Sequence, residues 1–478
     1  MKLLFRRLLT GTATFAALFL SATAISAQED ASRPKPAARE YPPLMGGSDG
    51  EDLNVEQEST ANLNPDTHPL TGVQNATLGM PGIRHSYWLS GLQYGNIVRS
   101  NSLNQPTSSG WNTTSYAVGN LSLVEAWSRA QLAVNYSGGG NFSSDPAQGN
   151  SYLHQFGLVQ TFDWGRWQLS FIDQFSYLPE TQFGFGGGTG LAVPGVGGSL
   201  APPPPGLQNN YTSDQTIFTT FGPRYSNAFA TQVVYGLSPR GSVTVAGSFG
   251  ILRFTEVGNI DTNQASFTAG YNYALTSEDT LGIQYRFGGY RFIGNPQAID
   301  DHTAQLMYGR KITGRLALRI FGGPEVTTLR LSVGTSTNRV SASGGANLTY
   351  GLNHGSLSLS CSHGLSGGSG VFTGANTDQL QFNFDRRLSR EWTSDWSFGY
   401  ARNGAVNSSP FSQLYNSFYV GGNLSRPLGR NANFTIGYTA QIQTSNQPVC
   451  AAGTCSTEFT VHQIMLGLQW HTRPFVLR

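Results

Sequence analysis

The sequence predicts an all-β fold, a transmembrane antiparallel β-barrel of about 18 strands, with about 16 to 20 strands compatible with the pattern. Three observations support this prediction. The composition is low in charge and rich in aromatic residues. Apolar and polar residues alternate in long runs, and the connections between those runs are alternately short and long.

Composition separates this chain from soluble enzymes and from helical membrane proteins. Only 12% of its 478 residues are charged and 12% are aromatic, whereas soluble domains average about 25% charged residues. After about residue 30 no apolar run reaches the roughly 20 residues that a transmembrane helix needs. A barrel accounts for both facts, because half of each strand faces lipid and half faces a polar interior.

The amino terminus predicts a secretory signal peptide over residues 1–27. An apolar core at residues 8–20 is followed by small residues, and Ala27 fits the last residue before cleavage. The positive charges that precede this core belong to Lys2, Arg6 and Arg7. The alternative is a retained helix.

Residues 28–82 are predicted to form an acidic, Pro-rich, disordered periplasmic arm. Residues 28–80 carry nine acidic and three basic side chains, a net charge of −6, and show no apolar period. A plug inside the barrel is the alternative, but so short and polar a segment makes a poor folded plug. The barrel itself is expected over residues 83–478.

The strand pattern has a period of two residues in runs of about 10 to 14 from residue 115 onward. A helix would repeat its apolar positions at three and four residues instead. Each run is long enough to cross a bilayer as a tilted strand, which takes about 9–11 residues. In residues 265–275 the apolar set is Phe267, Ala269, Tyr271, Tyr273 and Leu275.

Eight short turns divide these runs into hairpins. They are expected at residues 125–128, 163–166, 238–241, 277–279, 313–315, 353–355, 389–391 and 429–431. Sixteen strands flank the turns, and strands near 87–98 and 461–472 bring the count to eighteen. The interval 163–238 is longer than the others, so an extra hairpin there would raise the count to twenty.

The tryptophans give the barrel a direction. Trp127, Trp164, Trp167 and Trp392 lie at or beside short turns, and Trp470 lies near the end of the chain. Aromatic rings at one level form an interfacial girdle, and short turns are periplasmic in outer-membrane barrels. We therefore expect short turns and both termini in the periplasm, with long loops outside.

With these features, residues 83–478 resemble the porin-like outer-membrane proteins of Gram-negative bacteria. The resemblance rests on the signal peptide, the hairpin repeat, the aromatic girdle and the alternating last strand. It implies an outer-membrane location and insertion by the barrel-assembly machinery, which usually reads a terminal aromatic residue. Here Arg473, Pro474 and Phe475 follow the last predicted strand, so that machinery would read Trp470 or Phe475, or the tail would extend past the barrel.

Alternation also predicts which side chains line the lumen, which is water-filled in barrels of about 16–18 strands. Arg286 and Arg319 could set a mild anion preference at a constriction, or they could pair with Asp385 or Asp395 and brace the barrel. The candidate pore-lining residues are Gln284, Arg286, Lys311, Arg319, Asp385 and Asp395.

The connection at residues 181–213 contains no charged residue and no histidine. It holds a glycine-rich stretch at 184–190 and four consecutive prolines at 202–205. Two arrangements are open, an outward-facing mobile loop, which is favoured, and a loop folded into the lumen that narrows the pore.

The cysteines agree with export to an oxidising compartment. Cys450 and Cys455 are predicted to form a local disulfide within a loop, with two free thiols as the alternative. Cys361 is expected to be a small lipid-facing residue on the apolar face of a strand. No zinc site is expected, because further ligands are lacking near the pair.

Catalysis has little support in the sequence. The eight histidines are scattered, and no HExxH or GxSxG motif occurs. Asp300, Asp301 and His302 sit together, but such a group at a loop edge is more often a solvated patch or a weak cation site. No cofactor is implied, and no basic stripe indicates nucleic-acid binding.

Three functions are therefore open. The favoured one is an outer-membrane channel for passive or mildly selective diffusion of small hydrophilic solutes. The others are a barrel for export or uptake of a polymer such as a polysaccharide, and a structural or adhesive surface barrel with a closed lumen. The expected partners are membrane lipid, the assembly machinery and small solutes. The sequence leaves open whether the chain forms a homo-oligomer.

Overall fold

The computed structural model describes residues 86–101, 110–146, 149–178, 216–217, 222–332, 335–406, 413–446, 458–473 and 475–476. The predicted signal peptide, the acidic arm, the 181–213 loop and the pair Cys450 and Cys455 lie outside them.

Nineteen strands are formed in the described part of the chain. They are β1 (Tyr87–Ser100), β2 (Trp111–Ala126), β3 (Ala130–Ser143), β4 (Ser151–Trp164), β5 (Trp167–Leu178), β6 (Arg224–Ser238), β7 (Gly241–Phe254), β8 (Thr262–Ala274), β9 (Asp279–Phe292), β10 (Ala298–Lys311), β11 (Leu316–Ser332), β12 (Thr335–Leu352), β13 (Gly355–Ser366), β14 (Ala375–Arg387), β15 (Thr393–Ala405), β16 (Leu414–Pro427), β17 (Ala432–Ser445), β18 (Phe459–His471) and β19 (Phe475–Val476).

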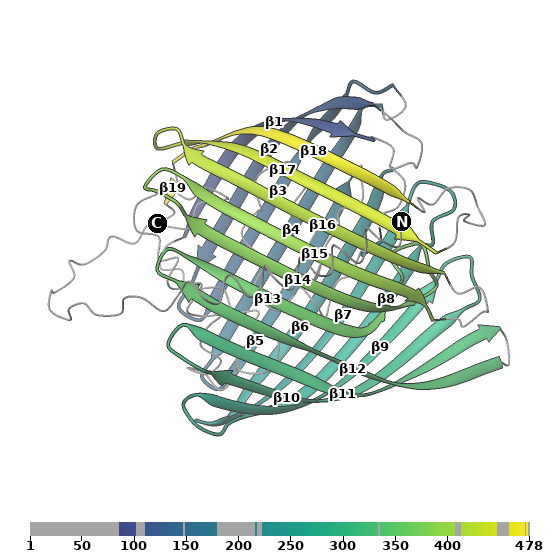
Figure 1. Cartoon of the computed structure of the whole chain (residues 1–478). Coiled ribbons are helices and arrows are strands. Elements are labelled where there is room, and N and C mark those ends of the chain that lie inside the picture. The colour runs from purple at the N-terminus through teal and green to yellow at the C-terminus, as the bar shows by residue number, and fades with distance from the viewer. Residues whose placement is uncertain are drawn as a thin grey trace, which may run out of the picture. The chain divides into compact units, whose positions relative to one another are not determined.

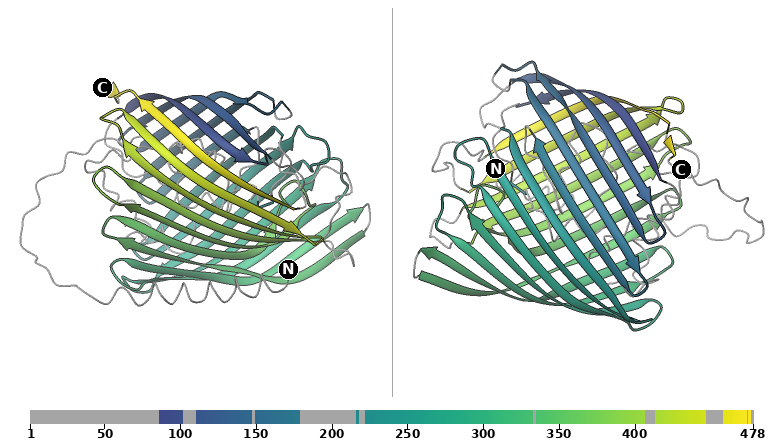
Figure 2. Two further views of the ribbon diagram at one scale, coloured as in Figure 1. Left: turned by 45° about the horizontal axis from the view of Figure 1, so that its top comes forward. Right: turned by 180° about the vertical axis from the view of Figure 1, so that it is seen from behind.

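The strands β1 to β18 form one closed antiparallel barrel. Each pairs with its neighbours in the sequence, and β18 pairs with β1, which closes the sheet (Figure 1). The wall can be followed around both sides in the two further views (Figure 2). The predicted count of eighteen is confirmed. The long interval between β5 and β6 adds no strand to the wall, because β5 pairs directly with β6.

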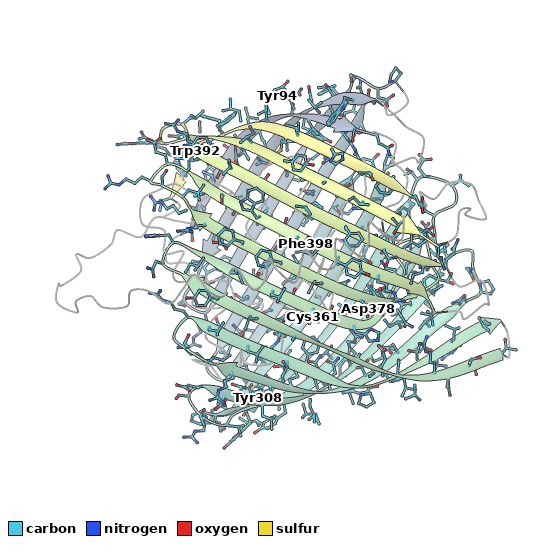
Figure 3. All side chains as sticks on the ribbon, viewed as in Figure 1. Tyr94, Tyr308, Cys361, Asp378, Trp392 and Phe398 are labelled. Atoms are coloured by element: carbon cyan, nitrogen blue, oxygen red, sulfur yellow. The ribbon has the colours of Figure 1, made fainter. Side chains whose placement is uncertain are left out.

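The two faces of the wall differ in polarity, as the alternation predicts. On β9 the side chains of Leu281, Ile283 and Tyr285 are 45%, 56% and 42% exposed on the outer face. Thr280 and Gln284, at alternate positions of the same strand, point inward and are buried. Residues that face each other in an antiparallel ladder share a face, so register extends this assignment from strand to strand. Phe398, Cys361 and Asp378 lie on the outer face (Figure 3), so Cys361 is on the predicted face of its strand, and its contact with lipid stays a prediction.

The eight predicted turns are all present, at what we call the turn end of the barrel. They occupy residues 127–129, 165–166, 239–240, 275–278, 312–315, 353–354, 388–392 and 428–431. The opposite end, the loop end, carries the other connections. One of these departs from the prediction, because β11 and β12 are joined by residues 333–334 alone. The reason is that these two strands, of 17 and 18 residues, continue where other hairpins have loops.

The tryptophans of the predicted girdle lie at the turn end of the barrel. Trp164 and Trp167 face each other across the β4–β5 turn, and Trp127 and Trp392 lie in two further turns. Trp470 lies opposite Ala432 on the neighbouring strand, at the same end. The rings of Trp127, Trp164, Trp167 and Trp470 are exposed, whereas Trp392 is half-buried. Exposed tryptophan rings suit an interface that is apolar on one side and wet on the other.

The carboxyl-terminal residues continue the wall after an interruption. β18 ends at His471, opposite Gly91, and Phe475 of β19 pairs with Trp88. Three residues, 472–474, thus correspond to two residues of β1, and the extra residue moves Phe475 to the outer face. Its ring centroid lies 6.0 Å from that of Trp88. As far as residue 476 the tail therefore belongs to the barrel wall and does not extend past it.

No helix in the described ranges is long and apolar enough to cross a membrane.

Candidate functional site: the turned-in hairpin and the inner wall

Two neighbouring hairpins separate at the loop end. The ladder between β12 and β13 stops at the pair Gly344 and His363. Beyond that pair β12 continues alongside β11 as far as Thr335, and β13 continues alongside β14 as far as Ser366. The β11–β12 hairpin runs on past its neighbours (Figure 1), whereas the β13–β14 hairpin takes a different course.

An interruption between β10 and β11 accompanies this separation. The ladder pairs Thr303 with Glu325 and Leu306 with Gly322, but it has no pairs between them. Pro324 has no N–H to donate to a ladder. At Gly323 a Cβ atom would overlap the carbonyl oxygen of Ala304, so only glycine allows the two backbones to approach this closely. Beyond this point β11 and β12 form the extended hairpin.

The connection between β13 and β14, residues 367–374, turns inward; we call it the turned-in loop. The N–H of Ile260 donates to the carbonyl of Gly370 (2.7 Å). Nε2 of Gln297 donates to the carbonyl of Thr373 (2.9 Å), whose hydroxyl donates back to Oε1 of Gln297 (2.8 Å). The turned-in loop thus reaches the connections at the loop ends of β7–β8 and β9–β10, which lie several places away around the barrel.

The backbone of the turned-in loop requires its glycines. Gly368, Gly370 and Gly374 have φ values of +81°, +80° and +84°, and Ser369 has +55°. Side chains with a Cβ rarely adopt this left-handed region. The sequence GGSG therefore encodes a tight inward bend.

Apolar side chains on the inner face hold the hairpin against the wall. One buried cluster combines inward-pointing residues of β9, β10 and β11 with the end of β13. Its members are Tyr290, Phe292, Ile299, Leu329, Leu365 and Val406, with Ile260 packed against them. A second cluster consists of Ile217, Phe372, Ala375 and Tyr415. Each fully buried large apolar side chain stabilises such a contact by about 1.5–3 kcal/mol.

Buried hydrogen bonds tie a third segment to the hairpin. The N–H of Thr216 donates to Oγ of Ser369 (2.9 Å), and its hydroxyl donates to Oδ1 of Asn403 (2.7 Å). Thr377 donates to the same oxygen of Asn403 (2.9 Å). Residues 216–217, the β13–β14 hairpin and β15 are thereby joined on the inner side.

An ionic cluster on the inner face lies directly beside the base of the hairpin. Nη2 of Arg286 is 3.2 Å from Oδ2 of Asp301 and 4.0 Å from Oε1 of Glu325. The two carboxylate side chains are each 1% exposed, and hydroxyl groups of Thr303 and Ser341 donate to them at 3.0 and 3.1 Å. With two carboxylates against one guanidinium, the cluster has a formal charge of −1.

Glu325 couples this cluster to the hairpin. Its Oε1 accepts from the main-chain N–H of Leu365 at 3.3 Å. Leu365 lies beyond the last β12–β13 pair, so this carboxylate takes the place of a ladder partner. A buried N–H without an acceptor would cost about 1–3 kcal/mol.

We expect Glu325→Ala to loosen the turned-in hairpin. The substitution removes the acceptor of Leu365 and one of the two carboxylates beside Arg286. Hydrogen exchange followed by mass spectrometry should show faster exchange over residues 364–376. Glu325→Gln keeps an acceptor oxygen and should protect these amides more than Glu325→Ala does. Glu391→Ala at the turn end is the matched control. Equal exchange in Glu325→Ala and the unsubstituted chain would refute this role.

The structure places all six predicted pore-lining residues on the inner face of their strands. Gln284 and Arg286 lie on β9. Lys311 and Arg319 lie toward the turn end, where Arg319 packs over the ring of Phe321, 5.6 Å from its centroid. Asp385 accepts from Ser356 and faces Asp395 in the ladder. Whether these residues line a conducting pore stays a prediction.

The alternative that Arg286 or Arg319 is braced by Asp385 or Asp395 is wrong. The acidic partners of Arg286 are Asp301 and Glu325, which hairpin register brings beside it on β10 and β11. Arg319 instead lies opposite Asn347, whose amide oxygen accepts from Nη2 at 2.6 Å once the amide is oriented to do so.

Asp300, Asp301 and His302 do not form a common site. Asp301 points inward, whereas its two sequence neighbours lie on the outer face, because successive residues of a strand alternate. Nδ1 of His302 is 2.7 Å from the hydroxyl of Tyr285, another outer-face side chain. Within the described ranges, no three histidine, cysteine or acidic side chains are grouped to hold a metal ion.

The turned-in loop is the part of the site that the sequence pattern did not single out. One signal was present: the stretch GGSGVFTG places Val371 and Phe372 in a connection, where apolar residues are unusual. Glu325 was also missed. An acidic residue at an inward position of a strand, next to a proline, is the pattern that could have indicated it.

Comparisons with known proteins were made for sequence and for structure. No protein-family model matches the sequence, and no curated protein matches it. Among solved structures, the outer membrane protein opdK from Pseudomonas aeruginosa has 10% identity and a TM-score of 0.42, covering 83% of this chain and 100% of its own. OpdL from the same organism has 12% identity and a TM-score of 0.41, covering 82% and 99%.

The ferric citrate transporter FecA is also similar, with 9% identity, a TM-score of 0.39 and coverage of 82% of this chain and 80% of its own. At such values no property is transferred from these proteins. The fold stands on the pairing of its own strands: the chain forms a closed antiparallel β-barrel of eighteen strands with an added short strand.

Proposed function

We propose that this protein is an outer-membrane channel through which small hydrophilic solutes diffuse. The observation that carries the proposal is the closed barrel of eighteen strands with an apolar, exposed outer face and a polar inner face. Barrels of about 16–18 strands enclose more space than their own side chains fill, which leaves an aqueous path.

The outer face supports placement in a membrane. The wall strands have 12 to 18 residues, and a tilted strand needs about 9–11 residues to cross the hydrocarbon layer. Exposed leucine, isoleucine and aromatic side chains on that face would otherwise be in water. The tryptophans at the turn end support an interface at that level, with the short turns in the periplasm.

The charges of the inner face support selection by size more than by sign. Arg286 is offset by two carboxylates, so it gives no anion preference by itself. The remaining candidates, Lys311, Arg319, Asp385 and Asp395, are of mixed sign. A conduit for a charged polymer would need a continuous stripe of one sign. We assign the size limit to the turned-in loop.

Liposome swelling tests this function directly. Vesicles that contain the refolded full chain should swell in isosmotic solutions of small sugars, and the rate should fall steeply as sugar size increases. Swelling should differ little between neutral sugars and charged solutes of equal size. Vesicles that do not swell with any sugar would overturn the proposal and favour a barrel with a closed lumen.

A further inference from the structure

Three arginines form a connected row on the outer face at the loop end, across β7 to β11. We call Arg253, Arg291 and Arg330 the arginine row. Nη2 of Arg253 donates to Oδ1 of Asn263 (2.5 Å), and Asn263 lies opposite Arg291 in the ladder. Nη2 of Arg291 is 2.6 Å from Oδ1 of Asp300, and Nη2 of Arg330 is 2.6 Å from Oδ2 of the same carboxylate.

Main-chain carbonyls hold two of the three guanidinium groups of the row in position. Nη1 of Arg253 donates to the carbonyls of Leu252 and Thr262, both at 2.9 Å. Nη1 of Arg291 repeats this arrangement with the carbonyls of Tyr290 (2.9 Å) and Ile299 (3.0 Å). Side chains held in this way lose little further freedom when they bind a ligand.

The row carries more positive charge than its partners neutralise. Arg291 and Arg330 share the single carboxylate of Asp300, which leaves a formal charge of +1. The carboxylate is covered, with a side chain only 7% exposed, whereas the two arginine side chains are 48% and 58% exposed. The surface that the row presents outward is therefore cationic. Arg253 extends it, with Asp261 at 3.9 Å.

At the turn end of the outer face the ion pairs are balanced in charge. There Arg310 has Asp279 at 3.7 Å, and Arg426 has Glu391 at 2.5 Å, one carboxylate for each guanidinium. The arginine row therefore has an excess positive charge, whereas the ion pairs on the outer face at the turn end are balanced.

Apolar side chains adjoin the row on the side toward the middle of the barrel. Tyr285 and Leu306 are 42% and 64% exposed there, on β9 and β10. A cationic strip above an apolar band matches a lipid, with its anionic head group at the strip and its acyl chains along the band. Arginine suits phosphate, because its planar group can donate two parallel hydrogen bonds.

We infer that the arginine row binds the phosphate groups of an anionic lipid in the leaflet at the loop end. This inference rests on the proposed outer-membrane placement, in which that leaflet is the outer one. Its lipid is then a phosphorylated glycolipid, and lipid A is the probe of choice. The row holds the lipid beside the β9–β11 wall without contact with the lumen.

The test compares two double variants of the full chain, each refolded in detergent and checked for heat-modifiable migration in gels. Arg291→Gln with Arg330→Gln removes two positive charges and changes the formal charge of the group with Asp300 from +1 to −1. Arg310→Gln with Arg426→Gln removes two positive charges at the turn end. Binding of lipid A is measured by native mass spectrometry and by fluorescence titration, with the form lacking one phosphate as a second ligand.

We expect the first double variant to bind lipid A at least about tenfold more weakly than the unsubstituted chain. This loss of affinity corresponds to the loss of about one charge-assisted contact. The turn-end variant should bind lipid A as tightly as the unsubstituted chain does. The unsubstituted chain should bind the singly phosphorylated lipid more weakly than it binds lipid A. Equal binding by the first double variant, or equal losses in both variants, would overturn the inference.

The outcome separates this site from the proposed function. If sugars pass through the barrel but the first double variant keeps its affinity for lipid A, only the lipid site is wrong. If no sugar passes but that variant alone loses lipid A, the channel is wrong and the site stands.

Discussion

Replacing the turned-in loop, residues 367–374, with an Asn-Gly turn is expected to raise single-channel conductance about twofold or more, because conductance follows the width of the narrowest part of a pore. Ser366 and Ala375 already face each other in the ladder, and a two-residue Asn-Gly turn joins such a pair without strain. The replacement removes Phe372 from its cluster and frees the partners of Gly370 and Thr373. The measurement is the conductance of single channels in planar bilayers.

The matched control shortens the connection between β3 and β4, residues 144–150. The residues of this connection that the structure describes are exposed or half-buried. The same Asn-Gly replacement there should leave conductance unchanged. Larger sugars should also enter liposomes through the first variant and be excluded by the control. Equal conductance in the two variants would show that the loop does not limit the pore.

Gly323→Val is expected to prevent formation of the closed barrel. The new side chain would overlap the carbonyl of Ala304 on the neighbouring strand, and a backbone group cannot be moved aside as a flexible side chain can. We expect a loss of at least about 3 kcal/mol of stability, the upper end for overpacked positions. The folded fraction is read from heat-modifiable migration after refolding in detergent micelles.

The neighbouring residue provides the control for this prediction. At Gly322 the nearest atom to an added Cβ is the carbonyl oxygen of Ser343 at 3.5 Å, an ordinary contact. Gly322→Val should therefore refold to nearly the normal yield, and its side chain would join the apolar outer face. Similar yields for the two variants would contradict the close approach of β10 and β11 at this point.

Much of the barrel was accessible from the sequence, because its signals are local. A lipid-facing strand must alternate, and a tight turn must contain polar or glycine residues, so the turns around Gly165, Pro239 and Gly429 could be located without tertiary information. The number of strands then followed from counting hairpins. Even the doubtful interval between β5 and β6 did not change that count.

The turned-in loop could not be located in this way. Its course depends on where the β12–β13 ladder stops and on contacts with strands that lie far from it in the sequence, such as those of Gln297 and Ile260. The sequence left open whether the connection at residues 181–213 faces outward or folds into the lumen, and that connection lies outside the described residues. The contacts described above belong to residues 367–374.

The partners of Arg286 show a second limit. Alternation assigns its side chain to the inner face, but only register tells which carboxylates are near. The β9–β10 ladder places Arg286 opposite Thr303, and Asp301 lies one inward position further along β10. Counting register from the connection at residues 293–297 would have found this neighbour. To identify Glu325 as the second partner of Arg286, the pairing of β10 with β11 must also be known.

Planar-bilayer recording of the unsubstituted, refolded chain tests the central claim most directly, namely that this barrel is an open channel for small solutes. We expect stable steps of current that are ohmic in voltage and that reverse near zero voltage across a gradient of potassium chloride, because the pore does not select by the sign of charge. A membrane that stays silent while gels show a fully folded barrel would contradict it.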